Sequence, residues 1–140
     1  MQPDQARLSD TAAWLAKAAA DLRSAEHALC APSPLREDAL FHSQQAVEKS
    51  LKAFLTWHDM PYRKTHSIEE LGRQCAALDG SLGPLVDEAV PLSEYAWKFR
   101  YPGESETPTA EETDEALRLA RRVVAAILNR LPGEARPQID

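Results

Sequence analysis

The stretch FHSQQAVEKSLKAFL, residues 41–55, decides the fold. Apolar side chains recur in and beside it at three- and four-residue steps, the spacing of one helical face; they are Leu40, Val47, Leu51 and Phe54, widened by Ala46, Ala53 and Leu55. The helix is expected to begin near Ser33 or Pro34 and to end near His58, because Asp59, Met60 and Pro61 follow. A long helix with one apolar stripe predicts packing against other helices.

The flanking sequence predicts only helices. They are expected over residues 9–30, 67–78, 83–99 and 109–131, with Pro91 splitting, kinking or shortening the fourth. Ser67 with Glu70, and Thr109 with Glu112, have capping-box spacing. No segment alternates with period two. We therefore predict an all-α antiparallel bundle of four to five helices, one domain over residues 1–131, and a frayed polar tail over residues 132–140.

Composition limits the classes of partner. The chain of 140 residues carries a formal charge of −6, which argues against broad, non-specific nucleic-acid binding but leaves open a small basic site on an acidic body. No run approaches the roughly 20 apolar residues of a membrane helix, and the N-terminus has no apolar signal core. We therefore expect a cytoplasmic protein with no membrane partner. Cys30 and Cys75 are expected to be free and buried, since their separation fits no metal site and two thiols form no disulfide framework.

The polar side of residues 41–55 has two interpretations. Gln45, Glu48 and Lys52 follow Phe41 along one line of the helix, and Glu48 precedes Lys52 in the favourable i,i+4 order. Such a row is typical of a solvated helix face with a surface ion pair. The alternative is a row that holds a ligand or partner.

A second candidate group lies in residues 93–104. Four of the nine aromatic residues of the chain, Tyr95, Trp97, Phe99 and Tyr101, surround Arg100 there. Arginine binds phosphate or carboxylate through two parallel hydrogen bonds, and aromatic rings stack bases or cover a partner. In the structural alternative, the rings close the core and Arg100 caps a helix end.

Standard enzyme and metal signatures are missing from the sequence. The four histidines, His27, His42, His58 and His66, have no zinc-binding spacing. There is also no glycine-rich phosphate loop and no nucleophile elbow. We therefore expect neither a metal nor a cofactor.

Together these segments resemble the HEPN domain family (higher eukaryotes and prokaryotes nucleotide-binding). The resemblance rests on residues 41–55, then THSIEELG (65–72) and LSEYAWKFRYP (92–102), and it extends from AAADLRSAEHAL (18–29) to the last helix. The family pattern A-x-x-Q-Q-A-x-E-K-x-x-K-A is matched at Gln44, Gln45, Ala46, Glu48, Lys49, Lys52 and Ala53.

The resemblance implies two long antiparallel helices and a homodimer. It also implies a possible partner, a minimal nucleotidyltransferase, with which some members form toxin–antitoxin pairs. Other members are metal-independent ribonucleases, marked by Arg, four to six residues, then His. Here Arg100 has no histidine in range. Arg36 and His42 match formally, but they lie in another helix and project about 120° apart.

Three functions follow as hypotheses. The first is a non-catalytic HEPN dimer that binds a nucleotide, RNA or a partner nucleotidyltransferase; its candidate residues are Gln45, Glu48, Lys49, Lys52, Tyr95, Arg100 and Tyr101. The second is a ribonuclease toxin in which Arg100 stabilises charge on a phosphate and His42 or His66 acts as the base. The third is a purely structural helical adaptor.

Overall fold

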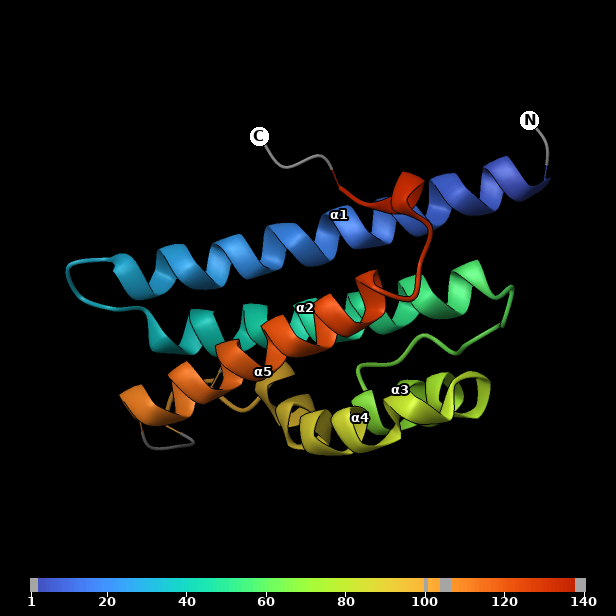
Figure 1. Ribbon diagram of the computed structural model, residues 1–140. Helices are drawn as coiled ribbons and strands as arrows, with labels where there is room; N and C mark the ends of the chain where they lie inside the picture. Colours follow the sequence, from blue (N-terminus) through green and yellow to red (C-terminus); the bar gives the residue numbers. More distant parts are fainter. Residues whose placement is uncertain (1–2, 100, 104–106, 138–140) are drawn as a thin grey trace.

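The structure, a computed structural model, describes residues 3–99, 101–103 and 107–137. These residues form an all-α bundle of five α-helices, with 3₁₀ turns and no strand among them (Figure 1). The α-helices are α1 (Pro3–Cys30), α2 (Arg36–Trp57), α3 (Ile68–Leu78), α4 (Gly83–Ala89) and α5 (Ala110–Leu128). The predicted fold class is confirmed.

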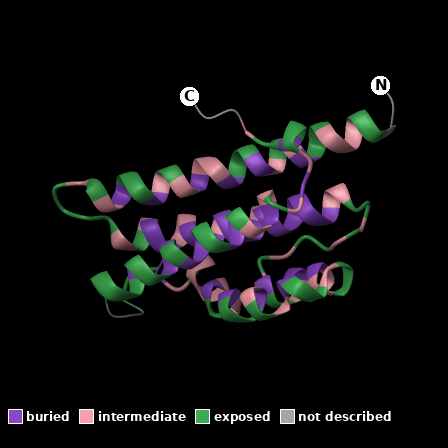
Figure 2. Ribbon diagram, in the orientation of Figure 1, coloured by how far each residue is buried: buried purple, intermediate pink, exposed green. Residues whose placement is uncertain are grey.

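Helix α2 is the centre of the bundle. It packs along α1 over most of its length, and α3 and α5 also pack against it. Thirteen of its 22 residues are buried, including polar ones, whereas α1 and α5 are exposed on their outer sides (Figure 2). The side of α2 that sequence analysis could assign to solvent therefore lies inside the protein.

The start of α1 differs from the prediction. The helix begins at Pro3 instead of Ser9. Proline fits a first helical turn, and Asp4 beside it stabilises the positive end of the helix dipole. The hydroxyl of Thr11 donates to the carbonyl of Arg7, one turn earlier, at 2.7 Å, so Thr11 lies within the helix.

The predicted caps and the break at Pro91 are confirmed. The amide of Glu70 donates to Ser67 Oγ at 3.1 Å, and Thr109 and Glu112 form a complete capping box. Residues 83–99 are divided into α4 and a 3₁₀ segment, Val90–Ala96, because Pro91 has no amide proton for a continued helix. Helix α5 ends at Leu128, three residues before the predicted end.

The core lies between α2 and its neighbours. Leu15, Leu51, Phe54 and Ile127 are among its largest fully buried side chains. The C-terminal segment also contributes: a 3₁₀ turn, Gly133–Ala135, packs on α1 and buries Ala135 completely. In Figure 1 this segment, drawn in red, folds back over α1. Residues 133–135 are therefore ordered, where sequence analysis expected a frayed end.

Candidate functional site around Glu48 and His66

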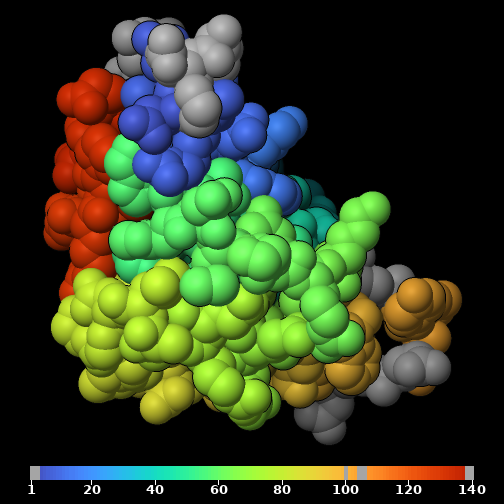
Figure 3. Space-filling model, turned by 90° about the vertical axis from the view of Figure 1, so that its right-hand side faces the viewer, coloured from blue at the N-terminus to red at the C-terminus, as the bar shows by residue number. Residues whose placement is uncertain are grey.

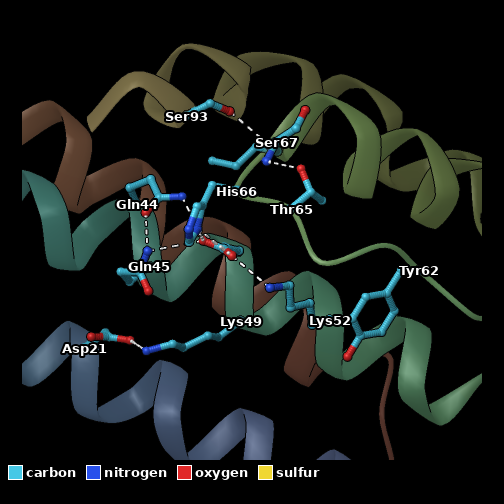
Figure 4. Close-up of polar contacts among 12 residues, drawn as sticks. Asp21, Gln44, Gln45, Lys49, Lys52, Tyr62, Thr65, His66, Ser67 and Ser93 are labelled. Carbon is cyan, nitrogen blue, oxygen red and sulfur yellow. Dashed lines mark hydrogen bonds and ion pairs between the residues drawn. The ribbon is translucent and has the colours of Figure 1, made fainter. Parts of the chain in front are cut away.

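The most unusual polar group is the carboxylate of Glu48, near the middle of α2. Its side chain is 3% exposed, yet four side chains hold it (Figure 4). Lys52 Nζ donates to Oε1 at 2.8 Å, and the amides of Gln44 and Gln45 donate to Oε2 at 3.0 and 3.2 Å. His66 Nδ1 lies 3.1 Å from both carboxylate oxygens. We refer to these five residues as the Glu48 network.

These contacts keep Glu48 ionised. Burial favours the neutral acid, but hydrogen bonds from Lys52, His66 and Gln44 outweigh burial and lower the pKa of Glu48. The predicted Glu48–Lys52 pair is therefore real, but it is a buried pair and not a surface one. The interpretation of this row as a solvated face is wrong, because Glu48 and Lys52 are buried and Gln45 is half-buried.

His66 connects the buried carboxylate to solvent. Its side chain is 70% exposed and lies in the link between α2 and α3, directly before the capping residue Ser67. Because Glu48 is ionised and accepts, Nδ1 of His66 carries the proton. In the neutral ring Nε2 then has a free lone pair, and in the cationic ring it is a donor. His66 thus presents a positioned nitrogen at the surface.

A shallow hollow of about 360 Å³ lies beside His66. Thr65, His66, Ser67 and Glu69 line it from the link and α3, and Val90, Ser93 and Trp97 line it from the opposite side. The Ser93 hydroxyl accepts from the amide of Ile68 at 3.0 Å, which ties the two sides together. Trp97 is 59% exposed, so its indole is free to contact a ligand or partner. We refer to this region as the His66 hollow.

The aromatic segment divides between core and surface. Phe99 is buried, and half-buried Tyr95 stacks on it with ring centroids 6.0 Å apart, as the structural interpretation predicts. Trp97 and Tyr101 are exposed, as the binding interpretation predicts. Arg100, named as a catalytic and binding candidate, lies outside the described residues.

A second buried carboxylate, Asp21 of α1, binds two of the other candidate residues, His42 and Lys49, which are not part of the Glu48 network. His42 Nδ1 lies 2.8 Å from Oδ1 of Asp21, and Lys49 Nζ donates to Oδ2 at 2.7 Å. His42 and His66 therefore belong to different clusters. Arg36 donates weakly to the carbonyl of Pro108 at 3.5 Å, so the formal Arg36–His42 match is not a contact pair.

Three contributors to these clusters were not predicted from the sequence. Gln44 was recognised only as a pattern match, Trp97 was not separated from its aromatic neighbours, and Asp21 was not considered. The carboxylates pair with residues 18 and 28 positions away, and such contacts leave no mark in a local pattern. Only the polar identity of Gln44 at a position facing the core could have indicated the network.

Among the described residues there is neither a metal-binding cluster nor a membrane-spanning helix. Within residues 3–99, 101–103 and 107–137, no group of three His, Cys, Asp or Glu side chains is arranged to hold a metal ion. In the same part of the chain, no helix combines the length and apolar character that crossing a bilayer requires.

The fold and the network define a class: an all-α bundle whose central helix buries a glutamine–glutamate–lysine constellation. The sequence model of the HEPN domain matches residues 11–131. The chain therefore belongs to the HEPN domain family, whose members are associated with nucleotide binding, with ribonuclease toxins and with nucleotidyltransferase pairs. Comparison with curated proteins and with solved structures gave no match.

Proposed function

We propose that this HEPN domain is a non-catalytic recognition module that binds a nucleotide unit, free or within RNA, at the His66 hollow. The observation that carries the proposal is the position of an exposed imidazole beside an exposed indole. The imidazole of His66 is held in position by the carboxylate of buried Glu48, and Trp97 lines the His66 hollow together with it. Tyr101, four residues later in the chain, is also exposed.

The two side chains suit the two parts of a nucleotide. A base stacks on an exposed aromatic face, and an imidazole N–H or a nearby hydroxyl binds phosphate or ribose. The Glu48 network supplies rigidity, because His66 cannot rotate without leaving the carboxylate. In this proposal Glu48 and Lys52 hold the site in place, while Trp97 and His66 make the contacts.

Calorimetry tests the proposal. AMP, ATP and a short RNA are titrated into the protein and into Trp97→Ala, in parallel with Arg100→Ala. We expect binding by at least one ligand and a loss of about tenfold in Trp97→Ala, from one lost stacking contact. Trp57→Ala is the matched control, because that indole packs near Arg7 and does not line the hollow. No heat with any ligand would favour a purely structural adaptor.

We also propose a homodimer and a nucleotidyltransferase partner for this chain. HEPN domains often pair with a nucleotidyltransferase, which supports the second part. Light scattering after gel filtration tests the dimer, and a mass near 15.5 kDa would exclude it. Copurification with the nucleotidyltransferase encoded nearest to this chain tests the partner, and purification of this chain alone would count against it.

A ribonuclease is the second candidate, because the Glu48–His66 contact is typical of a carboxylate that orients a histidine base. A neutral Nε2 could take the proton of a ribose 2′-hydroxyl and so start strand cleavage. Alanine at His66, at His42 and at Arg100 is the test. Cleavage that survives all three changes would exclude this candidate, whereas loss only in His66→Ala would support it.

A further inference from the structure

A second hollow lies on the other side of the Glu48 network. It is a groove of about 470 Å³, lined by Asp10, Ala13, Trp14 and Lys17 of α1, by Thr56 of α2 and by Tyr62 of the link. We refer to it as the Trp14 groove. Two of its six lining residues are aromatic, and the hydroxyl of Tyr62 lies 3.4 Å from that of Thr56.

The Trp14 groove and the His66 hollow are connected through the Glu48 network. Lys52 Nζ lies 5.5 Å from the centre of the Trp14 ring and 2.8 Å from the Glu48 carboxylate, which also holds His66. Figure 4 places Tyr62 beyond Lys52, whereas Ser93, in the His66 hollow, lies on the opposite side of the network. One base therefore cannot stack in both places.

The link between α2 and α3 joins the two hollows directly. Tyr62 lines the groove, Thr65 and His66 line the hollow, and between them come Arg63 and Lys64, both exposed. Arg63 is paired with Glu70 at 2.7 Å, so Lys64 offers the less engaged charge. Figure 3 shows the link in green on one end of the molecule, between α1 (blue) and α3 (yellow-green).

We propose that the ligand is a single-stranded polynucleotide that follows this link, with one base at Trp97 and another in the Trp14 groove. Stacking of bases on aromatic side chains beside basic residues is a usual means of holding single strands, and it requires only a small basic site on this acidic chain. Lys17 and Lys64 face the backbone phosphates, and His66 binds between the two platforms. Asp10 and Glu69 border the path, and Glu69 is neutralised by Arg73 at 2.9 Å. This inference rests on the proposed function, since it extends the same site.

The test compares ligand lengths. Fluorescence anisotropy measures binding of labelled adenylate RNAs of two, four and six nucleotides, with AMP as competitor. We expect the hexanucleotide to bind at least tenfold more tightly than AMP, because it adds a second stacked base. Equal affinity for AMP and the hexanucleotide would overturn the inference and leave the proposed function standing. No binding at any length would overturn both.

Variants locate the second base. Trp14→Ala is expected to weaken hexanucleotide binding about tenfold and to leave AMP binding unchanged, whereas Trp97→Ala weakens both. Since Trp14 is partly buried, Lys17→Glu, at an exposed position, repeats the test without risk to folding. Trp57→Ala controls for the loss of a partly buried indole. Wild-type hexanucleotide affinity in both groove variants would overturn the inference, as would equal binding of an acidic peptide of matched charge.

Discussion

Lys52 Nζ lies 2.8 Å from Glu48 Oε1, one turn away on α2, and both side chains are buried. A buried pair of this kind gives little net stability, since each ion loses its hydration. Removal of one partner alone is nevertheless destabilising, because the other charge then stays buried without a counter-charge. The pair therefore contributes little to net stability, but loss of either partner alone is costly.

Lys52→Met should reveal this asymmetry. The variant keeps the aliphatic stem but leaves Glu48 without its cation, so we expect a loss of about 3 kcal/mol in the free energy of unfolding at pH 7. Urea denaturation measures it. The double variant Glu48→Gln/Lys52→Met should recover much of the loss, since no charge remains. Additive losses in the double variant would contradict this account.

The lowered pKa of Glu48 predicts a dependence of stability on pH. Its value in the folded protein is below the ordinary 4.5, so the folded state binds the proton less tightly than the unfolded state. The contribution of the carboxylate is complete above pH 4.5 and is lost as the pH falls through the lower folded value. The difference in the free energy of unfolding between wild type and Glu48→Gln should therefore shrink as the pH falls below 4.5.

Urea denaturation between pH 7 and pH 3 measures this difference. Other carboxylates with lowered pKa values, Glu70, Asp79 and Glu115, are present in both proteins and cancel in the comparison. A difference that stays constant or grows toward acid would show that Glu48 is not held ionised by its neighbours.

Gly72 is expected to accept even an alanine side chain only at a cost in stability. A Cβ atom there would lie 3.0 Å from Cβ of Val86, and neither atom can move by rotating a bond. Alanine favours helix by up to about 1 kcal/mol, but overpacking costs about 1–3 kcal/mol, so Gly72→Ala should be destabilising by about 1 kcal/mol. Thermal unfolding measures the change. Gly80→Ala is the control, because nothing lies within 4 Å of its added carbon.

The two cysteines should differ in reactivity. Burial raises the pKa of the Cys75 thiol to about 12, whereas Cys30 is exposed at the end of α1, so the prediction of a buried thiol is wrong for Cys30. A thiol reagent should therefore modify only Cys30 in the native protein, and both residues in denaturant. Mass spectrometry of the labelled peptides checks this, with Cys30→Ser as the control that should remain unlabelled. Fast native labelling of Cys75 would mean that α3 opens readily.

The helices were largely predictable, because local chemistry determines them. The stripe through Val47, Leu51 and Phe54, the cap at Ser67 and the break at Pro91 each act within a few residues. The early start of α1 was missed because Ser9 is also a good capping residue, so the local signal had two solutions. The family and its fold class followed from the sequence as well.

The candidate site was less predictable, because its contacts cross the bundle. Glu48 and Lys52 could be paired from spacing alone, but His66, which also holds Glu48, comes from a link 18 positions away in the chain. The exposure of Trp97 likewise depends on how the 3₁₀ segment ends beside α3, whereas Phe99, two residues later, is buried. No periodicity distinguishes these two aromatic residues.

The C-terminal turn has a practical consequence for protein production. The HEPN match covers residues 11–131, and a chain trimmed to that span would lose the first two turns of α1 and the turn that buries Ala135. Leu8, which packs against the core, would be removed with them. Apolar surface on α1 would then meet water, so the shortened chain should express poorly or aggregate. Homology limits are thus a poor guide to where this domain can be cut.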